Sequence, residues 1–219
     1  MTKKLLKQDA IRLVIFDLDG TLVDAYPAIT RSFNYTMRIL RYPVQGDAVI
    51  RRAVGWGDKN LLRPFVQSKD FSRAVMLYRR HHRASLLKGT RLFPGAGLLL
   101  RRLKDKGYLL AVASNRPGRF ARIVLRHVGI RRLFSYVLCS DKLKTMKPHP
   151  EILKVIMKKL GVLARQTLYI GDMAIDAQAG RAARVKTIIV TTGSSSKAEI
   201  KRQGPFRVID TLKGLADLL

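Results

Sequence analysis

The sequence predicts an α/β fold: a parallel sheet covered by helices, with an all-helical segment inserted after the first strand. Residues 11–16 are apolar apart from Arg12 and rich in branched side chains, which is typical of a strand buried on both faces. From residue 93 onward, short apolar runs alternate with helical stretches of about 10 to 12 residues, which predicts right-handed parallel crossovers. Residues 26–89 show helical spacing and no strand pattern.

The inserted segment is expected to contain helices separated by short turns. Helical spacing of apolar residues predicts them over 28–40, 47–54, 59–66 and 71–87. Gly89 is expected to end the last helix. We therefore assign residues 25–92 to a helical cap, and residues 1–24 and 93–219 to the α/β core.

The core elements follow in alternation after the cap. We expect strands at 108–113, 136–139, 167–170 and 187–190, with a probable edge strand at 206–209. Helices are expected over 94–106, 117–128, 150–160 and 174–183. Three consecutive serines, Ser194 to Ser196, are expected to form a loop.

Composition places the chain in the soluble globular class. It has 219 residues, 47% of them apolar and 26% charged, and no apolar run approaches the roughly 18 residues of a membrane span. No membrane partner is expected. Charged residues interrupt the first apolar stretch, so we expect no signal peptide and a cytoplasmic location. Cys139 is the only cysteine, which excludes an internal disulfide and predicts a small buried thiol.

The net charge of +28 comes from 43 Lys and Arg residues against 15 Asp and Glu residues, spread over both predicted units. Such a field would concentrate phosphorylated small molecules and would hold nucleic acid loosely, in a salt-sensitive way. The chain contains neither a zinc-finger spacing nor an aromatic RNA-binding signature, so nucleic acid is expected to bind only non-specifically. A compositional habit of the source organism explains the charge equally well.

Polar residues follow several of the predicted strands. In a parallel sheet the residues after each strand meet at one edge, which is where ligands bind. The residues expected to converge there are Asp17, Asp19, Ser114, Asn115, Lys147, Asp172 and Asp176.

Asp17 and Asp19 share a face if the strand continues through them. Two like charges at that spacing repel unless a cation lies between them, and Mg²⁺ suits two carboxylates that leave room for phosphate oxygens. An isolated Asp-x-Asp-Gly could equally be a simple turn. The other polar residues at the same edge favour the functional interpretation.

This set of residues suits phosphoryl transfer. Asp17 is the candidate nucleophile, forming an aspartyl-phosphate, and Asp19 the acid that protonates the leaving oxygen and then activates water. Ser114 and the amide of Asn115 would bind a phosphoryl oxygen, and Lys147 would place a positive charge between nucleophile and phosphate. Asp172 would bind Mg²⁺ together with Asp17 and the backbone carbonyl of Asp19. Asp176 would hold a metal-bound water or support the ligands.

Four segments resemble the motifs of the haloacid dehalogenase superfamily, in the same order. They are FDLDGT at 16–21, ASN at 113–115, KPHP at 147–150 and GDMAID at 171–176. The resemblance implies a Rossmann-like core and a Mg²⁺-dependent phosphatase whose cap closes over the substrate. True dehalogenases lack the second carboxylate that this chain keeps at Asp19. Ala25 and Arg184 depart from the family pattern, which often has Ser and Gly at these positions.

The first motif and the small helical cap look most like the phosphoglycolate phosphatase branch, which also contains pyrophosphate, nucleotide and sugar-phosphate enzymes. The expected function is therefore hydrolysis of a small phosphate monoester such as phosphoglycolate. A phosphomutase of the same fold, or a basic protein acting on the phosphate ends of nucleic acid, are the alternatives. A monomer and a homodimer are both compatible with the sequence.

Substrate contacts in the cap are expected near the Gly55-Trp56-Gly57 stretch. Glycine lets backbone approach a ligand and Trp56 can cover it, although a helix-to-helix turn with a packed tryptophan fits as well. Arg52 and Lys59 flank this stretch and could bind a carboxylate or a second phosphate, or simply be solvated. The four histidines have no metal-ligand spacing, so zinc is not expected.

Overall fold

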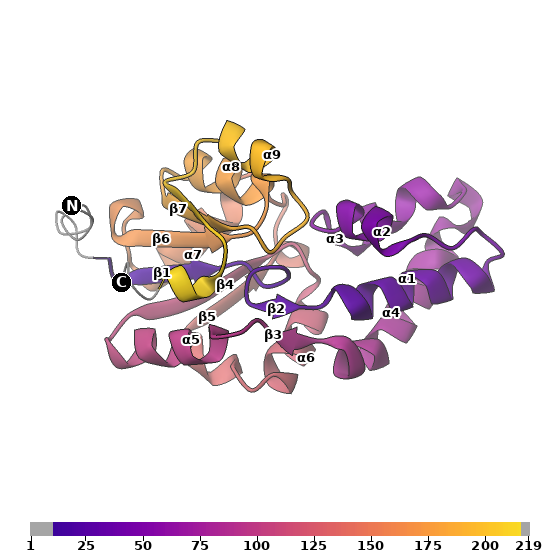
Figure 1. Ribbon diagram of the computed structural model, residues 1–219, viewed down its shortest axis with the longest axis horizontal. Coiled ribbons are helices and arrows are strands. Elements are labelled where there is room, and N and C mark those ends of the chain that lie inside the picture. Colours follow the sequence, from indigo (N-terminus) through magenta and orange to yellow (C-terminus); the bar gives the residue numbers. More distant parts are fainter. Residues whose placement is uncertain (1–10, 216–219) are drawn as a thin grey trace.

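The computed structural model describes residues 11–215 (Figure 1). The first ten residues, where no signal peptide is expected, lie outside the described residues. None of the helices in the described part combines the length and apolar character needed to cross a membrane.

A six-stranded parallel sheet forms the core, in the order β5-β4-β1-β6-β7-β8. The strands are β1 Leu13–Phe16, β4 Leu109–Ser114, β5 Tyr136–Cys139, β6 Thr167–Gly171, β7 Lys186–Val190 and β8 Arg207–Ile209. The α/β class and the edge position of the last strand are confirmed. Cys139 is buried at the end of β5, as expected.

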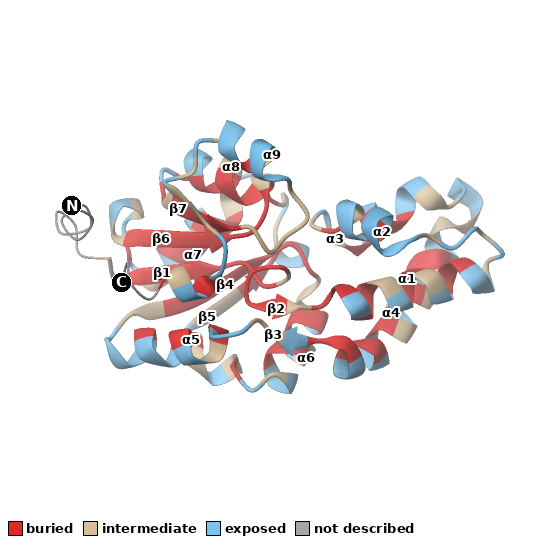
Figure 2. Ribbon diagram, in the orientation of Figure 1, coloured by how far each residue is buried: buried red, intermediate tan, exposed pale blue. Residues whose placement is uncertain are grey.

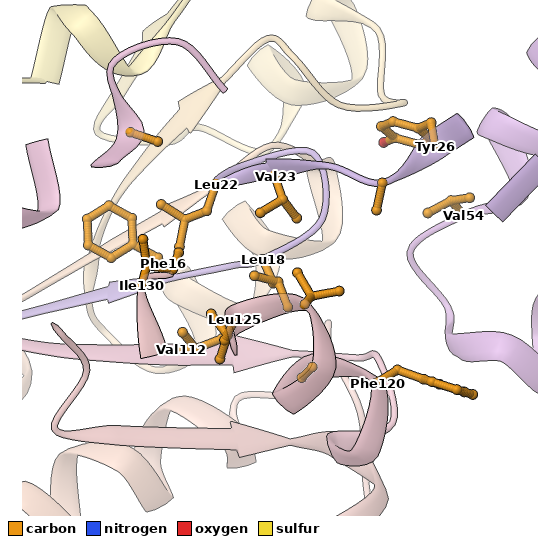
Figure 3. Packing of buried hydrophobic residues seen from close by; sticks show 14 of the residues in the cluster. Phe16, Leu18, Leu22, Val23, Tyr26, Val54, Val112, Phe120, Leu125 and Ile130 are labelled. Atoms are coloured by element: carbon orange, nitrogen blue, oxygen red, sulfur yellow. The ribbon is translucent and has the colours of Figure 1, made fainter. Parts of the chain in front are cut away.

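Helices cover both faces of the sheet, which explains why β1 is apolar throughout. They are α5 Ala96–Asp105, α6 Gly118–His127, α7 Glu151–Leu160, α8 Ala174–Ala182 and α9 Lys197–Arg202. Val14 and Phe16 belong to the core cluster that includes α5 and α6, part of which Figure 3 shows. Leu13 and Ile15 belong to a second cluster with α7 and α8. The central strands are buried along their length (Figure 2).

Four helices form the insert: α1 Tyr26–Ile39, α2 Asp47–Ala53, α3 Gly57–Leu62 and α4 Phe71–Gly89. The helix expected over 59–66 instead begins at Gly57 and ends at Leu62, followed by a 3₁₀ turn over Arg63–Phe65. Pro64 explains the early end, because it has no N–H and its ring clashes with the carbonyl four residues earlier in an α-helix. We call α1 to α4 the cap. Further 3₁₀ turns lie at Ser68–Asp70, Arg131–Leu133, Ser140–Lys142, Ala164–Gln166 and Leu212–Leu215.

Two short elements were not expected. β2 Val23–Asp24 and β3 Arg91–Leu92 pair antiparallel and join the two ends of the insert to the core (Figure 1). β3 falls inside the range assigned to the cap. The serine stretch leads into α9, where the Ser196 hydroxyl accepts from the amide of Glu199 in a capping box. The S-x-x-E spacing of Ser196 and Glu199 is the sequence pattern that indicates this helix start.

Arg184 adopts a backbone conformation that favours glycine, the residue that the family resemblance leads one to expect here. Its φ is 58°, in the left-handed region that costs other residues energy. It follows α8 in a Schellman arrangement, because its amide donates to Arg181 O and the amide of Val185 donates to Gly180 O. The Schellman turn therefore forms although arginine is unfavourable in the left-handed region.

Arg184→Gly is expected to raise the free energy of unfolding by about 0.5 to 1 kcal/mol. The gain is the left-handed cost of about 1 to 2 kcal/mol, less the entropy that glycine loses on folding. Arg184→Ala removes the same charge but keeps the strain, so it should bring no gain. Urea denaturation of the three proteins measures the difference, and equal stability of the two variants would contradict this account.

His82 is a buried polar residue where the cap meets the core. It is 2% exposed, and it stacks on Tyr78 of the same helix and meets the edge of Phe120 on α6. Burial, helped by the charge of Arg116, lowers the pKa of His82 to about 2. Burial therefore favours the neutral imidazole in the folded protein.

This histidine should make the protein less stable in mild acid. In the unfolded chain its pKa is about 6.5, so below that pH the unfolded state binds a proton that the folded state does not. Stability then falls as pH falls, and wild type should lose about 2 kcal/mol more than His82→Gln between pH 7 and pH 5. Urea unfolding at both pH values measures this, and parallel losses in the two proteins would refute it.

Candidate active site

The residues expected at the carboxyl edge of the sheet do meet there. Asp17 and Asp19 follow β1, Ser114 ends β4, and Asp172 follows β6. Lys147 arrives on the loop between β5 and α7. One carboxylate oxygen from each of Asp17, Asp172 and Asp176 lies within 4.8 Å of the other two. Of the three, Asp17 lines the pocket described below.

Lys147 is the cation at the centre of this group. It is 2% exposed, and its Nζ lies 2.8 Å from Asp17 Oδ1 and 2.8 Å from Asp176 Oδ1. Burial alone would lower the pKa of Lys147, but the two carboxylates outweigh burial and raise it. The lysine is therefore charged, and it touches the candidate nucleophile directly.

Asp176 organises the loop that carries Asp172. Its Oδ1 accepts from Lys147 and from the Tyr169 hydroxyl at 2.6 Å. Its Oδ2 accepts from the backbone amides of Asp172 and Met173 at 3.1 and 3.0 Å. With both oxygens engaged, Asp176 matches the supporting role rather than that of a direct ligand.

Asp172 has one oxygen held and one left over. Thr21 donates to its Oδ1 at 2.6 Å, whereas Oδ2 is buried without a hydrogen-bond partner among the described residues. A Cβ on Gly20 or on Gly193 would lie 2.2 or 2.0 Å from that oxygen, so only glycine fits on either side. An orphaned buried carboxylate oxygen is costly unless a ligand binds it.

The electrostatics of the cluster fit a divalent cation. Burial raises the pKa of Asp17 to about 6, against the opposing effect of Lys147, and burial with the nearby Asp17 and Asp176 charges raises that of Asp172 well above its usual range. In both cases burial is the main cause, neighbouring carboxylates add to it, and the charge of Lys147 opposes it. Hard oxygen donors with one unpaired oxygen are what Mg²⁺ binds.

Ser114 and Asn115 have different roles at the end of β4. The Ser114 hydroxyl accepts from the amide of Arg116 at 3.1 Å and lines the pocket. The Asn115 side chain accepts from the amide of Lys147 and donates to Lys147 O and Gly55 O. Its amide group therefore fixes Lys147 and touches the cap, which leaves the backbone of Asn115 as the candidate phosphate donor.

Arg116 is a site residue that the sequence analysis missed. Its Nε and Nη2 donate to the two carboxylate oxygens of Asp19 at 2.6 and 2.7 Å. Arg116 is 7% exposed, so this fork is a buried ion pair. Arg116 lies two residues past the end of β4. Its position at a strand end, like that of Ser114 and Asn115, is the sequence signal that indicates a site residue.

A pocket separates this cluster from the cap. The cap contributes apolar side chains to its wall, namely Ile29, Val54, Leu61 and Tyr78. Asp58 also lines it and forms a partly buried ion pair with Arg79, with 2.6 Å between Oδ2 and Nε. The pocket is thus charged on the core side and mostly apolar on the cap side.

Only some of the cap residues expected to contact substrate line the pocket. Gly55 and Gly57 line the pocket, whereas Trp56, which is 40% exposed, and Lys59 are not among its lining residues. Arg52 turns toward the loop after β7, where it donates to Ser194 O and forms a bidentate ion pair with Glu199. That ion pair joins cap to core.

Comparisons with known proteins agree with this geometry. Residues 14–190 match the model of the haloacid dehalogenase-like hydrolase family. The phosphoglycolate phosphatase of Haemophilus influenzae is 31% identical over 220 residues, covering 95% of this chain and 98% of the relative. That of Pseudomonas putida is 32% identical over 213 residues, covering 93% of this chain and 78% of the relative.

A solved structure shares the fold over nearly the whole chain. The crystal structure described as a predicted phosphoglycolate phosphatase from Haemophilus somnus superposes with a TM-score of 0.90 at 26% identity, covering 95% of this chain and 97% of the other. The resemblance carried by the four motifs is confirmed: the chain belongs to the haloacid dehalogenase-like hydrolase family.

Proposed function

We propose that this protein hydrolyses a small phosphate monoester, such as phosphoglycolate, with Mg²⁺ and through an aspartyl-phosphate on Asp17. Its class, a phosphoric monoester hydrolase, follows from the family together with the relatives named phosphoglycolate phosphatase. The finer statement rests chiefly on one observation. Lys147 contacts Asp17 in a pocket that Asp19 also lines, and carboxylate oxygens of Asp17, Asp172 and Asp176 lie within 4.8 Å of one another.

In the first half-reaction, a carboxylate oxygen of Asp17 attacks phosphorus. The new bond joins that oxygen to phosphorus, the bond from phosphorus to the ester oxygen breaks, and the leaving alcohol takes a proton from Asp19. Lys147 and the Ser114 hydroxyl would bind phosphoryl oxygens. When bound, Mg²⁺ would be held by Asp17, Asp172 and the Asp19 carbonyl, and would neutralise phosphate charge.

In the second half-reaction, a water molecule attacks the phosphorus of the aspartyl-phosphate. Its proton passes to Asp19, its oxygen bonds to phosphorus, and the bond to Asp17 breaks. Inorganic phosphate leaves and both aspartates regain their starting state. Asp19 thus acts once as an acid and once as a base.

The pocket favours a small leaving group. The cap covers the carboxylates and its apolar wall faces them, so bulk water is excluded when substrate fills the space. The large positive charge of the chain would draw anionic metabolites toward it. We infer a small phosphorylated metabolite as the partner, a cytoplasmic location, and a monomer or homodimer.

Asp17→Asn should abolish turnover while leaving the fold intact. An amide cannot form the phosphoryl intermediate, so kcat with phosphoglycolate and Mg²⁺ should fall by about 1,000-fold or more. Phosphate release from a panel of phosphorylated metabolites measures both the substrate preference and this loss. Circular dichroism and urea unfolding report on the fold.

Asp105→Asn provides the matched control, because Asp105 is exposed at the end of α5, which leads into the start of β4 at the edge of the sheet opposite to the candidate site. It should retain full activity. Turnover of Asp17→Asn within tenfold of wild type would contradict the proposed nucleophile.

A further inference from the structure

A chain of hydrogen bonds runs from the cap to Asp19. The Ser32 hydroxyl donates to Ala28 O within α1 and lies 3.1 Å from His82 Nδ1 on α4. The other ring nitrogen, Nε2, lies 3.0 Å from Nη1 of Arg116. Arg116 in turn holds both oxygens of Asp19. Two cap helices are thereby connected to the acid–base residue.

The direction of each bond follows from the chemistry of its members. Arginine offers only donors, so Nε2 of His82 must be the acceptor. A neutral imidazole that accepts at Nε2 carries its proton on Nδ1 and donates it to Ser32. Ser32 donates its own proton to Ala28 O, so its oxygen can accept from His82, and Nδ1 of His81 lies 3.2 Å from the same hydroxyl.

The residues of this hydrogen-bond series are packed tightly. His82, Arg116 and Ser32 are each at most 7% exposed. Rings of Tyr78 and Phe120 hold the imidazole at centroid distances of 4.8 and 5.1 Å. The planar fork of a guanidinium fixes the orientation of the carboxylate that it binds. The carboxylate of Asp19 therefore has its orientation set by a residue that the cap itself anchors.

We propose that Arg116, anchored by His82 of the cap, is a positioning residue that orients the Asp19 carboxylate for hydrolysis of the aspartyl-phosphate. The inference rests on the proposed function. In the step concerned, Asp19 accepts the proton of the attacking water while the bond between phosphorus and Asp17 breaks. The cap thus takes part in the chemistry of the core, in addition to covering the substrate.

p-Nitrophenyl phosphate separates this step from the first one. Its leaving group departs without needing a proton, so the first half-reaction does not depend on Asp19 as an acid. In Arg116→Lys the positive charge remains but the fork is lost. Its steady-state kcat should fall about 100-fold, the loss that a misplaced catalytic group produces. Its kcat/KM, which reports the first half-reaction, should stay within about threefold of wild type.

The same variant should accumulate the intermediate. Rapid mixing of Mg²⁺-loaded enzyme with p-nitrophenyl phosphate should give a burst of about one nitrophenolate per enzyme, followed by slow turnover. Acid quenching would trap the aspartyl-phosphate on Asp17. A purely structural role of Arg116 would instead reduce the fraction of active enzyme, lowering kcat, kcat/KM and the burst together.

Variants of His82 supply the matched pair. In His82→Leu the volume is roughly kept but Arg116 loses its acceptor, so the burst and the loss of kcat should appear in weaker form, about tenfold. His82→Gln can place an amide oxygen near the position of Nε2, and it should restore kcat. Urea unfolding checks that both variants are folded.

The outcomes distinguish the two claims. If wild type is active but kcat and kcat/KM of Arg116→Lys fall by the same factor and no burst is seen, Arg116 has no positioning role. The proposed phosphatase activity is unaffected by that result. Equal kcat in His82→Leu, His82→Gln and wild type likewise refutes the anchoring by the cap. Wild-type protein that turns over neither p-nitrophenyl phosphate nor phosphoglycolate refutes the proposed function and this inference with it.

Discussion

The contact of Lys147 with two buried carboxylates is the interaction on which the site depends. Its Nζ lies 2.8 Å from both Asp17 and Asp176, in a region closed to water. Without that charge, three carboxylates within 4.8 Å of one another would repel in a medium that screens poorly. Burial raises the pKa of Asp17 and of Asp172, one lysine offsets this only in part, and Oδ2 of Asp172 has no hydrogen-bond partner within the described part of the chain. The fold thus builds a deficit of positive charge where a metal and a phosphate would meet.

The parallel sheet explains how much of this could be predicted from the sequence. Strand β1 is recognisable because it is buried on both faces, and the carboxyl-edge rule then brings Asp17, Lys147 and Asp172 together without further information. Local signals also sufficed for most helices. The pairing of β2 with β3 could not be predicted, because two-residue strands carry no periodicity.

Contacts between distant segments could not be predicted from the sequence, for a different reason. His82 occupies the apolar face of α4 four residues after Tyr78, and spacing alone cannot distinguish a packed histidine from one that binds across an interface. Arg52 was expected near substrate because it flanks a glycine pair, but its partner Glu199 lies on α9, a helix that was not expected. Which of many arginines in so basic a chain is buried depends on its tertiary partner, and Arg116 has one in Asp19.

Calorimetric titration with Mg²⁺ measures whether the buried carboxylates form a cation site. Wild type and Asp105→Asn should bind Mg²⁺ with equal affinity, and binding should raise their free energies of unfolding. Asp172→Asn should lose affinity by about 100-fold or more, because it removes the negative charge and replaces one of the two carboxylate oxygens with an amide nitrogen. Equal Mg²⁺ affinity in Asp172→Asn and wild type would contradict the account.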